Sequence, residues 1–560
     1  MNKTIHRESI RDLWKRIPLL LFVFVCVYSC VTVYFSSGSF AHSDIASELL
    51  LGNFLAGQNK IISTDWCYST GLKIIDVNLI YMPLFKVFDN WRTVHILAAI
   101  ILQAIMVASY YFFCRKIKMS QNAFFISASL LLLPVNLLYG RLVLYESYYA
   151  PCIIFSFLII GLFFSALDHH SDNPIKQALR ISLLLLIVFA SSLNGFRQFP
   201  STMLPLLVAT IVVIFKEREV QGRWLTHPYK NALGLALVIC VVGFAGSYFY
   251  SAVIANKYSF LELLDKNVMF ESVDELRQNS IAYLRLFGFE EGRALFSIEG
   301  VISCAGAIAA IVMLCISLRE LLQKSNDTSP FRAITIALYP VAMLLMTFIF
   351  LFYNGPSQQY YFTVFVLIFP FLGLLLDRIS VKNISAKQAL ILLVCAILFI
   401  IGLFNNLHYL RIVEQPPIDS QENIGFDDQE NLSGVLSYIE ENNCEVGYAT
   451  FWHANIITQL TNGQIPMIPV IRIYPYSIYL YQDWLTDKRM RALSFIEDRN
   501  VFFLLSNDEI DTFSNSELAM YGILTYQDEH FSIYEFDFSD AVWEYLDEQG
   551  SALGIESKQW

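Results

Sequence analysis

The chain has 560 residues, of which 56% are hydrophobic, 15% aromatic and only 16% charged. Soluble domains average about 25% charged residues, so this composition excludes an ordinary soluble protein and predicts a membrane protein with interfacial aromatic belts. The net charge of −11 is uneven: residues 412–560 carry 26 acidic and 6 basic side chains, whereas residues 1–411 carry 23 acidic and 32 basic ones. The only extensive polar region would repel phosphate, which argues against nucleic-acid binding.

Long apolar runs predict eleven transmembrane helices. The first run, residues 17–36, is uncharged and long enough to cross a bilayer. It is too long for a removable signal peptide, so we expect it to persist as a helix. The expected cores of the eleven helices are residues 17–36, 93–114, 122–140, 147–167, 181–196, 198–215, 232–255, 300–318, 333–353, 359–376 and 388–409.

The charges of the connecting loops predict a cytoplasmic N-terminus. With that orientation, the N-terminal segment and the five cytoplasmic connections hold 20 lysines and arginines, whereas the longer outer connections before Arg411 hold 11. Lysine and arginine accumulate on the cytoplasmic side of membrane proteins. An odd number of helices then places the acidic C-terminal region outside. We expect a multi-pass protein of the cell membrane, and the localisation predicted is a bacterial plasma or inner membrane.

The sequence divides into a transmembrane domain, residues 1–411, and an extracytoplasmic domain, residues 412–560. The first domain has two long outer loops, 37–92 and 256–299. In the first loop, residues 45–55 repeat apolar side chains every three or four positions, which suits a helix lying in the membrane surface.

The second domain alternates helices and strands, which predicts a small α/β fold with a partly parallel sheet. It has no G-x-G-x-x-G motif, so nucleotide binding is not indicated. We expect strands at 445–450, 466–471, 501–506, 523–527 and 531–536, and helices at 432–441, 453–461, 488–497 and 514–520.

A carboxylate stands just beyond the first predicted helix. Asp44 follows that helix by a few residues, and Glu146 lies at the outer mouth of the fourth predicted helix. Transfer of a sugar from a phosphate-linked donor needs a base for the acceptor hydroxyl, and a carboxylate serves. It also needs cations or hydrogen-bond donors for the charge of the leaving phosphate. Arg141 and Arg197, on short outer connections, are the candidate phosphate-binding cations.

The first long loop adds Glu48, Asp65 and Lys60 as candidates for acceptor binding. Each of the main candidates also has a structural interpretation. Asp44 and Glu146 are placed where helix caps are common, and interfacial arginines often contact lipid headgroups.

Two cysteines stand apart from the other eight. Those eight fall in apolar runs, where cysteine behaves as a small hydrophobe, whereas Cys67 and Cys444 lie in long outer segments. An oxidising compartment would allow them to pair, provided that they come within bonding distance. No C-x-x-C pair exists, so metal and redox frameworks have no support.

The chain resembles the GT-C superfamily of membrane glycosyltransferases, and most of all its branch of protein O-mannosyltransferases and lipid A aminoarabinose transferases. The resemblance lies in the helix plan, in Asp44 directly after the first helix, and in Glu146 before the fourth. A weaker match is the segment 355–362, where Gln359-Tyr360 stands in place of the Arg-Tyr pair of many relatives.

This resemblance implies an inverting transfer from a polyprenyl-phosphate sugar, with Asp44 and Glu146 as catalytic carboxylates. Arg141, Arg197 and Tyr360 would bind the donor phosphate. The acceptor would be a hydroxyl of a cell-envelope glycan, lipid or protein at the outer face, in contact with membrane lipids. Many members work without a metal, whereas the oligosaccharyltransferase branch uses a divalent cation, so Mg²⁺ or Mn²⁺ stays open as a cofactor.

Three other functions are compatible with parts of the sequence. A polysaccharide polymerase or O-antigen ligase also acts on lipid-linked glycans, but it relies on outer-loop arginine and histidine rather than on a carboxylate such as Asp44. A transporter or lipid flippase usually holds ionisable residues near mid-membrane, and the apolar runs here are almost free of them. A non-enzymatic envelope assembly protein would act through its C-terminal domain.

Overall fold

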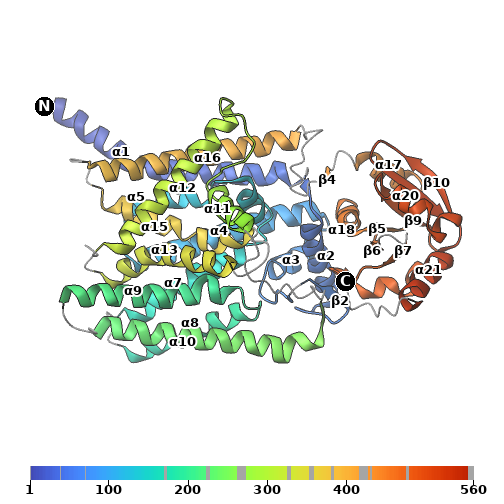
Figure 1. The fold of residues 1–560 in the computed structure, drawn as a ribbon, viewed down its shortest axis with the longest axis horizontal. Helices are drawn as coiled ribbons and strands as arrows, with labels where there is room; N and C mark the ends of the chain where they lie inside the picture. The colour runs from blue at the N-terminus through green and yellow to red at the C-terminus, as the bar shows by residue number, and fades with distance from the viewer. Residues whose placement is uncertain are drawn as a thin grey trace. The chain divides into compact units, whose positions relative to one another are not determined.

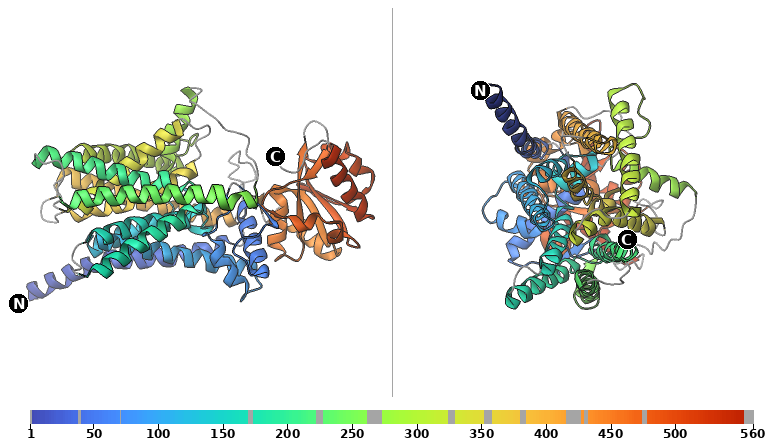
Figure 2. Two further views of the ribbon diagram at one scale, coloured as in Figure 1. Left: turned by 90° about the horizontal axis from the view of Figure 1, so that it is seen from below. Right: turned by 90° about the vertical axis from the view of Figure 1, so that its left-hand side faces the viewer.

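The computed structural model describes two compact units of the chain (Figures 1 and 2). The helical unit comprises Met1–Tyr34, Ala99–Tyr250 and Lys266–Arg411, and the α/β unit comprises Phe35–Ala98, Ser251–Asp265 and Ile412–Trp560. The described residues are 2–37, 40–69, 71–168, 173–221, 227–260, 273–323, 329–351, 358–379, 384–414, 427–428, 432–473 and 478–552.

Ten of the eleven predicted spans are helices long and apolar enough to cross a membrane, within the described ranges. They are Arg16–Ser36, Trp91–Lys116, Ala150–Leu167, Pro174–Ser192, Phe199–Glu217, Tyr229–Lys257, Ile298–Leu322, Pro330–Phe350, Gln358–Asp377 and Ala386–Leu407. The predicted fold class, a polytopic α-helical membrane protein that also carries an α/β unit, is confirmed.

The remaining predicted span, residues 122–140, is an interrupted helix. Helix α5 (Gln121–Leu131) ends before Pro134, and the chain continues as one helical turn, α6 (Leu137–Tyr139), and a π-helix, η1 (Gly140–Tyr145). Proline donates no backbone hydrogen bond and disfavours the helical conformation of the residue before it. The prediction of one continuous helix is therefore wrong. Residues 127–137 are all buried, which is where irregular backbone is tolerated at membrane depth.

The helices of the helical unit form a row in which α5, α15, α13, α9, α10, α8 and α7 each pack against the next. Figure 2 shows them in side view and end-on. Helix α7 is apolar all round and almost fully buried, as expected of a helix in the middle of a bundle. The long helices are α1 (Asn2–Ser36), α4 (Trp91–Lys116), α7 (Ala150–Leu167), α8 (Pro174–Ser192), α9 (Leu204–Gln221), α10 (His227–Phe249), α12 (Ile298–Leu322), α13 (Pro330–Leu351), α15 (Ile368–Asp377) and α16 (Ala386–Glu414).

The α/β unit is built on a six-stranded sheet with the strand order β10-β11-β9-β5-β6-β7. Strand β5 pairs in parallel with β6 and β9, and the other pairs are antiparallel. The predicted partly parallel sheet is thus confirmed. The strands are β5 (Val446–Thr450), β6 (Met467–Ile473), β7 (Ile478–Tyr481), β9 (Val501–Ser506), β10 (Gly522–Gln527) and β11 (Phe531–Phe536).

Helices cover both faces of this sheet (Figure 1). Alternate residues of β9 show the division, because successive side chains of a strand point to opposite faces. Phe502 and Leu504 join a core with α17 (Ser433–Glu441) and α18 (Phe451–Leu460), whereas Phe503 and Leu505 join a second core with α20 (Ile510–Ser514) and α21 (Ser539–Ala552). The sequence did not predict β7 or α21.

Helix α2 (Ser43–Gln58) lies inside the α/β unit, against α18 on one side and α3 (Asn78–Phe85) on the other. The Asn455 Nδ2 of α18 donates to the Ser47 Oγ at 2.7 Å. The fit to α3 is close, because a Cβ on Gly52 would stand 2.6 Å from the Tyr81 Cβ. The helix predicted over residues 45–55 is thus present, and protein covers most of its apolar residues. Its expected position in the membrane surface stays a prediction.

Candidate functional site

Asp44 occupies the first turn of α2. His42 is the N-cap of this helix, and its Nδ1 accepts a hydrogen bond from the Asp44 backbone N at 3.2 Å. The positive end of the helix dipole favours an ionised carboxylate at this position. The Asp44 side chain is half-buried, so it is a carboxylate with part of its surface accessible, as a general base requires.

Glu48 lies one helical turn after Asp44 and is buried, with 3% of its side chain exposed. Its Oε1 forms an ion pair with the Lys73 Nζ, and its Oε2 accepts from the Asn78 Nδ2 at 3.1 Å. Both carboxylate oxygens are therefore engaged by the segment that leads into α3. Lys73 and Asn78 were missed from the sequence, because their separation from Glu48 along the chain has no helical or strand periodicity.

Asp65 and Lys60 differ in their surroundings. The Asp65 Oδ2 accepts from the Gln58 Nε2 at 3.1 Å and from the Ser63 Oγ at 3.4 Å, which ties it to the turn after α2. Lys60 is exposed. Asp44, Glu48, Lys60 and Asp65 all belong to the α/β unit.

In the helical unit, Arg141 and Glu146 form a buried ion pair. The Arg141 Nε donates to both Glu146 oxygens, at 3.0 and 3.1 Å, and the two side chains are 2% and 6% exposed. The π-helix η1 makes this pair, because a π-helical turn brings residues five apart together, as the hydrogen bond from the Glu146 N to the Arg141 O at 2.8 Å shows. The sequence predicted both residues but not their pairing.

Arg197 stands between two tyrosine rings. Its guanidinium carbon lies 5.1 Å from the ring centroid of Tyr149 and 5.8 Å from that of Tyr360, within the range of cation–π attraction. Four other arginines of the predicted outer connections are paired with glutamates: Arg141, Arg277, Arg285 and Arg293. Arg197 forms no ion pair within the described part of the chain.

A π-helix lies next to Arg197 in the sequence, just as Arg141 belongs to the π-helix η1. A second π-helix, η2 (Phe199–Met203), begins two residues after Arg197, and the buried Gln198 between them donates to the Ser156 Oγ and the Thr202 Oγ1, both at 2.8 Å. π-Helical turns are frequent at functional sites. The structure thus brings the predicted residues Arg197 and Tyr360 together and adds Tyr149, which follows Glu146 by three positions.

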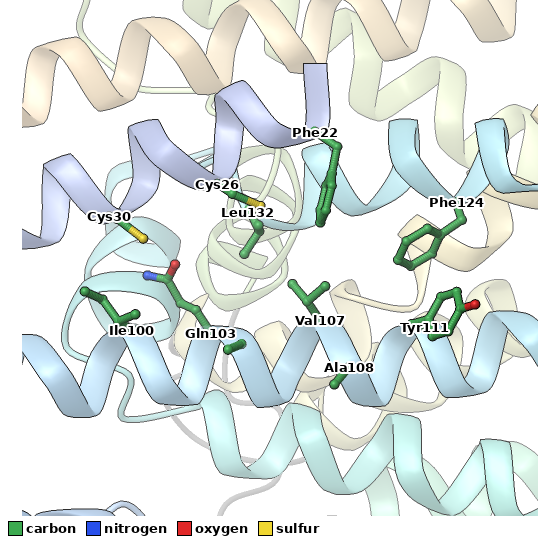
Figure 3. Close-up of a pocket in the computed structure, with 11 residues that line it drawn as sticks. Phe22, Cys26, Cys30, Ile100, Gln103, Val107, Ala108, Tyr111, Phe124 and Leu132 are labelled. Carbon is green, nitrogen blue, oxygen red and sulfur yellow. The ribbon is translucent and has the colours of Figure 1, made fainter. Parts of the chain in front are cut away.

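An apolar cavity of about 460 Å³ lies between α1, α4 and α5 (Figure 3). Its walls include Phe22, Cys26, Val107 and Phe124, and Gln103 is its main polar group. The sequence did not predict this cavity.

The divalent cation that the resemblance left open has no preformed cluster of side-chain ligands among the described residues. They contain no group of three or more histidine, cysteine, aspartate and glutamate side chains placed to hold a metal ion. Glu48, the carboxylate one turn from Asp44, has both oxygens engaged by Lys73 and Asn78. Mg²⁺ and Mn²⁺ need several oxygen ligands around one point, so we derive no step through a metal.

The hypothesis of a bond between Cys67 and Cys444 is wrong, because both thiols are free. The Cys67 Sγ–H donates to the Asp483 Oδ1 at 3.3 Å, and Cys444 is part of the core beside α17. Burial and then the Asp483 carboxylate raise the pKa of Cys67 to about 12, and burial and then Glu535 raise the pKa of Cys444 to about 12.

We therefore expect Cys67 and Cys444 to resist maleimide at pH 8 in the folded chain, because the thiolate is the reactive form and both pKa values lie far above that pH. After denaturation without reductant, mass spectrometry should find all ten cysteines alkylated. Two fewer alkylations, restored by reductant, would show a disulfide and contradict this expectation.

The fold and the site define an integral membrane protein with a half-buried carboxylate after its first span and an arginine held between tyrosines. No protein family and no curated protein matches the sequence. Among solved structures, the chain is similar to ArnT from Cupriavidus metallidurans bound to undecaprenyl phosphate, with 11% identity, a TM-score of 0.48, and 92% of this chain and 97% of ArnT covered.

It is also similar to the oligosaccharyltransferase from Archaeoglobus fulgidus in complex with zinc and sulfate. The identity is 10%, the TM-score is 0.46, and the match covers 92% of this chain and 72% of that enzyme.

Proposed function

We propose that this chain is a membrane glycosyltransferase of the GT-C type, which moves a sugar from a polyprenyl-phosphate donor to a hydroxyl of a cell-envelope acceptor at the outer face. The observation that carries the proposal is Arg197, a cation between Tyr149 and Tyr360 in the connection between two spanning helices. A cation that is held by ring faces rather than by a carboxylate keeps its charge available for an anionic ligand. Because this connection joins two helices that are long and apolar enough to cross a membrane, an anion carried on a lipid suits the position.

The reaction proposed here forms one bond and breaks one. The acceptor oxygen attacks the anomeric carbon while the bond between that carbon and the phosphate oxygen breaks, and the phosphate leaves with the electron pair. Attack from the side opposite to the phosphate inverts the anomeric centre. Asp44 takes the proton of the attacking hydroxyl, and Arg197 and the Tyr360 hydroxyl hold the phosphate.

The pair Arg141–Glu146 has a supporting part in this proposal. Glu146 is nearly buried, and its carboxylate accepts a hydrogen bond from the Nε of Arg141. We assign to Glu146 the positioning of the acceptor and to Arg141 a secondary share of the phosphate charge. Glu48, Asp65 and Lys60 remain candidates for acceptor contacts from the α/β unit, and the proposed orientation has the N-terminus in the cytoplasm and the α/β unit outside.

The test is a transfer assay with the full-length chain in lipid nanodiscs. The donor is a labelled undecaprenyl-phosphate sugar, the acceptors are an envelope glycan, a lipid and a protein, and released undecaprenyl phosphate is the readout. Replacing Arg197 by alanine should raise the KM for the donor by about 10- to 100-fold, because a hydrogen bond to a charged group contributes about 1.5–3 kcal/mol. Arg115→Ala is the matched control, since that arginine is exposed at the end of α4.

Turnover of a water-soluble nucleotide sugar, or equal KM values for the Arg197 and Arg115 variants, would contradict the proposal. If only a diphosphate-linked oligosaccharide is consumed, and Asp44 is dispensable, the polymerase or ligase function is the correct one.

A further inference from the structure

The interrupted helix between α5 and α7 has two backbone carbonyls that its break leaves outside the helical ladder. They belong to Pro134 and Val135, and both are satisfied by one side chain of α16: the Asn405 Nδ2 donates to them at 3.1 and 2.8 Å. An unsatisfied carbonyl at membrane depth costs several kcal/mol. Asn405 therefore stabilises the break itself.

The next residue of α16 holds the other end of the segment. The Tyr145 hydroxyl donates to the Asn406 Oδ1, and Asn406 is only 1% exposed. Tyr145 is the last residue of the π-helix η1 and the residue directly before Glu146. Two adjacent asparagines of one helix thus anchor both the start and the end of the interrupted segment.

A third anchor comes from α4. The Gln103 Nε2 donates to the Leu144 carbonyl at 2.7 Å, and its Oε1 accepts from the Ser29 Oγ of α1 at 2.9 Å. Figure 3 shows Gln103 projecting from α4 at the edge of the apolar cavity. Because both ends of the Gln103 amide are engaged and buried, its orientation is determined.

We propose that Asn405, Asn406 and Gln103 are positioning residues, which hold the π-helix η1 and so fix the geometry of the ion pair between Arg141 and Glu146. The hydrogen bonds of all three side chains to this segment end on residues 134, 135, 144 and 145, which flank Arg141 and Glu146. Buried polar contacts of this kind specify one geometry rather than adding much stability, since their net contribution is small and their loss leaves an unsatisfied group. The effect on kcat that is expected below rests on the proposed function.

The test compares Tyr145→Phe with Tyr110→Phe. Each variant loses a buried tyrosine hydroxyl that donates a hydrogen bond to a buried side chain, since the Tyr110 hydroxyl donates to the Ser127 Oγ at 2.7 Å. Tyr110 lies in α4 and its partner in α5, outside residues 132–146. We expect similar falls in Tm, but faster hydrogen exchange in peptides covering 137–146 only for Tyr145→Phe. We also expect a 10- to 100-fold lower kcat for that variant alone, since a small displacement of a reacting group has this effect.

A double variant, Tyr145→Phe with Asn406→Leu, distinguishes a change in the position of η1 from a change in the stability of the chain. Removing both partners of a buried hydrogen bond is nearly neutral for stability, so the Tm should return toward that of the unsubstituted chain while exchange stays fast and kcat stays low. Recovery of kcat together with Tm, or unchanged exchange in Tyr145→Phe, would overturn the proposal. If the unsubstituted chain transfers no sugar, the proposed function fails, and hydrogen exchange alone decides whether these residues hold η1.

Discussion

Replacing Asp44 by asparagine is expected to lower the rate of sugar transfer by about 10²–10⁴-fold, the usual contribution of a general base. Asparagine keeps the size of the side chain and its capacity to accept hydrogen bonds, so the N-terminus of α2 should still form. Because the donor phosphate is held by other groups in the proposed mechanism, the KM for the donor should change little. The measurement is kcat and KM for the donor, together with Tm, for purified folded variants.

Asp89→Asn is the matched control for this experiment. Asp89 lies in the same predicted outer loop, in the same unit, and is exposed, so its replacement changes the same formal charge away from α2. We expect its kcat to equal that of the unsubstituted chain. Near-full activity of Asp44→Asn would show that another group takes the proton, and a parallel loss in Asp89→Asn would assign the effect to loop charge.

Replacing Arg141 by methionine is expected to destabilise the chain by about 3–5 kcal/mol, because it leaves the Glu146 carboxylate buried without its partner. This is a large fraction of the roughly 5–15 kcal/mol that stabilises a folded domain. The effect should appear as a lower Tm in nanodiscs and as a loss of folded protein on extraction. It should exceed the effect of Arg285→Met, because Arg285 and its partner Glu291 are 41% and 38% exposed and water can solvate the remaining carboxylate.

The double variant Arg141→Met with Glu146→Leu distinguishes a structural pair from a functional one. Replacing both members of a buried ion pair by apolar side chains of similar volume is often neutral or stabilising, so we expect the Tm to recover. Transfer should nevertheless stay low, because the variant has lost the carboxylate that we assign to acceptor positioning. A double variant with restored Tm and restored activity would reduce the pair to a structural role.

Several elements were predictable because their signals are local. The strand pattern at 501–506 and the antiparallel pair at 523–527 and 531–536 were predicted within one residue of β9, β10 and β11, since apolar residues and turn signals are contiguous there. The predicted helix 488–497 was wrong: it is a 3-10 turn, Lys488–Arg491, followed by the short helix Leu493–Ile496. Lys488, Arg489 and Arg491 stand among apolar residues in a way that suggests an amphipathic helix, but no residue of this turn is buried.

In the candidate site, the residues were predictable from the sequence but their contacts were not. Asp44 and Glu146 were identified as carboxylates at the ends of apolar runs, which requires only the order of residues. The pairing of Arg141 with Glu146 was not predicted, because residues five apart do not meet in an α-helix and the π-helical turn of η1 is needed. Likewise, the contact of Arg197 with Tyr360 joins distant parts of the chain.

The sequence by itself determined that most of this chain is apolar helix, that an α/β region follows, and which carboxylates and arginines stand beside the helix ends. Hydropathy, periodicity and charge are properties of neighbouring residues, so they can be read without the fold. Only the tertiary structure decided that α2 is buried against α18 and that α16 supplies Asn405 and Asn406 to the broken helix. It also decided that Arg197 contacts the rings of Tyr149 and Tyr360 and, within the described residues, forms no ion pair. These features depend on which distant segments meet, and burial together with hydrogen-bond satisfaction selects those partners.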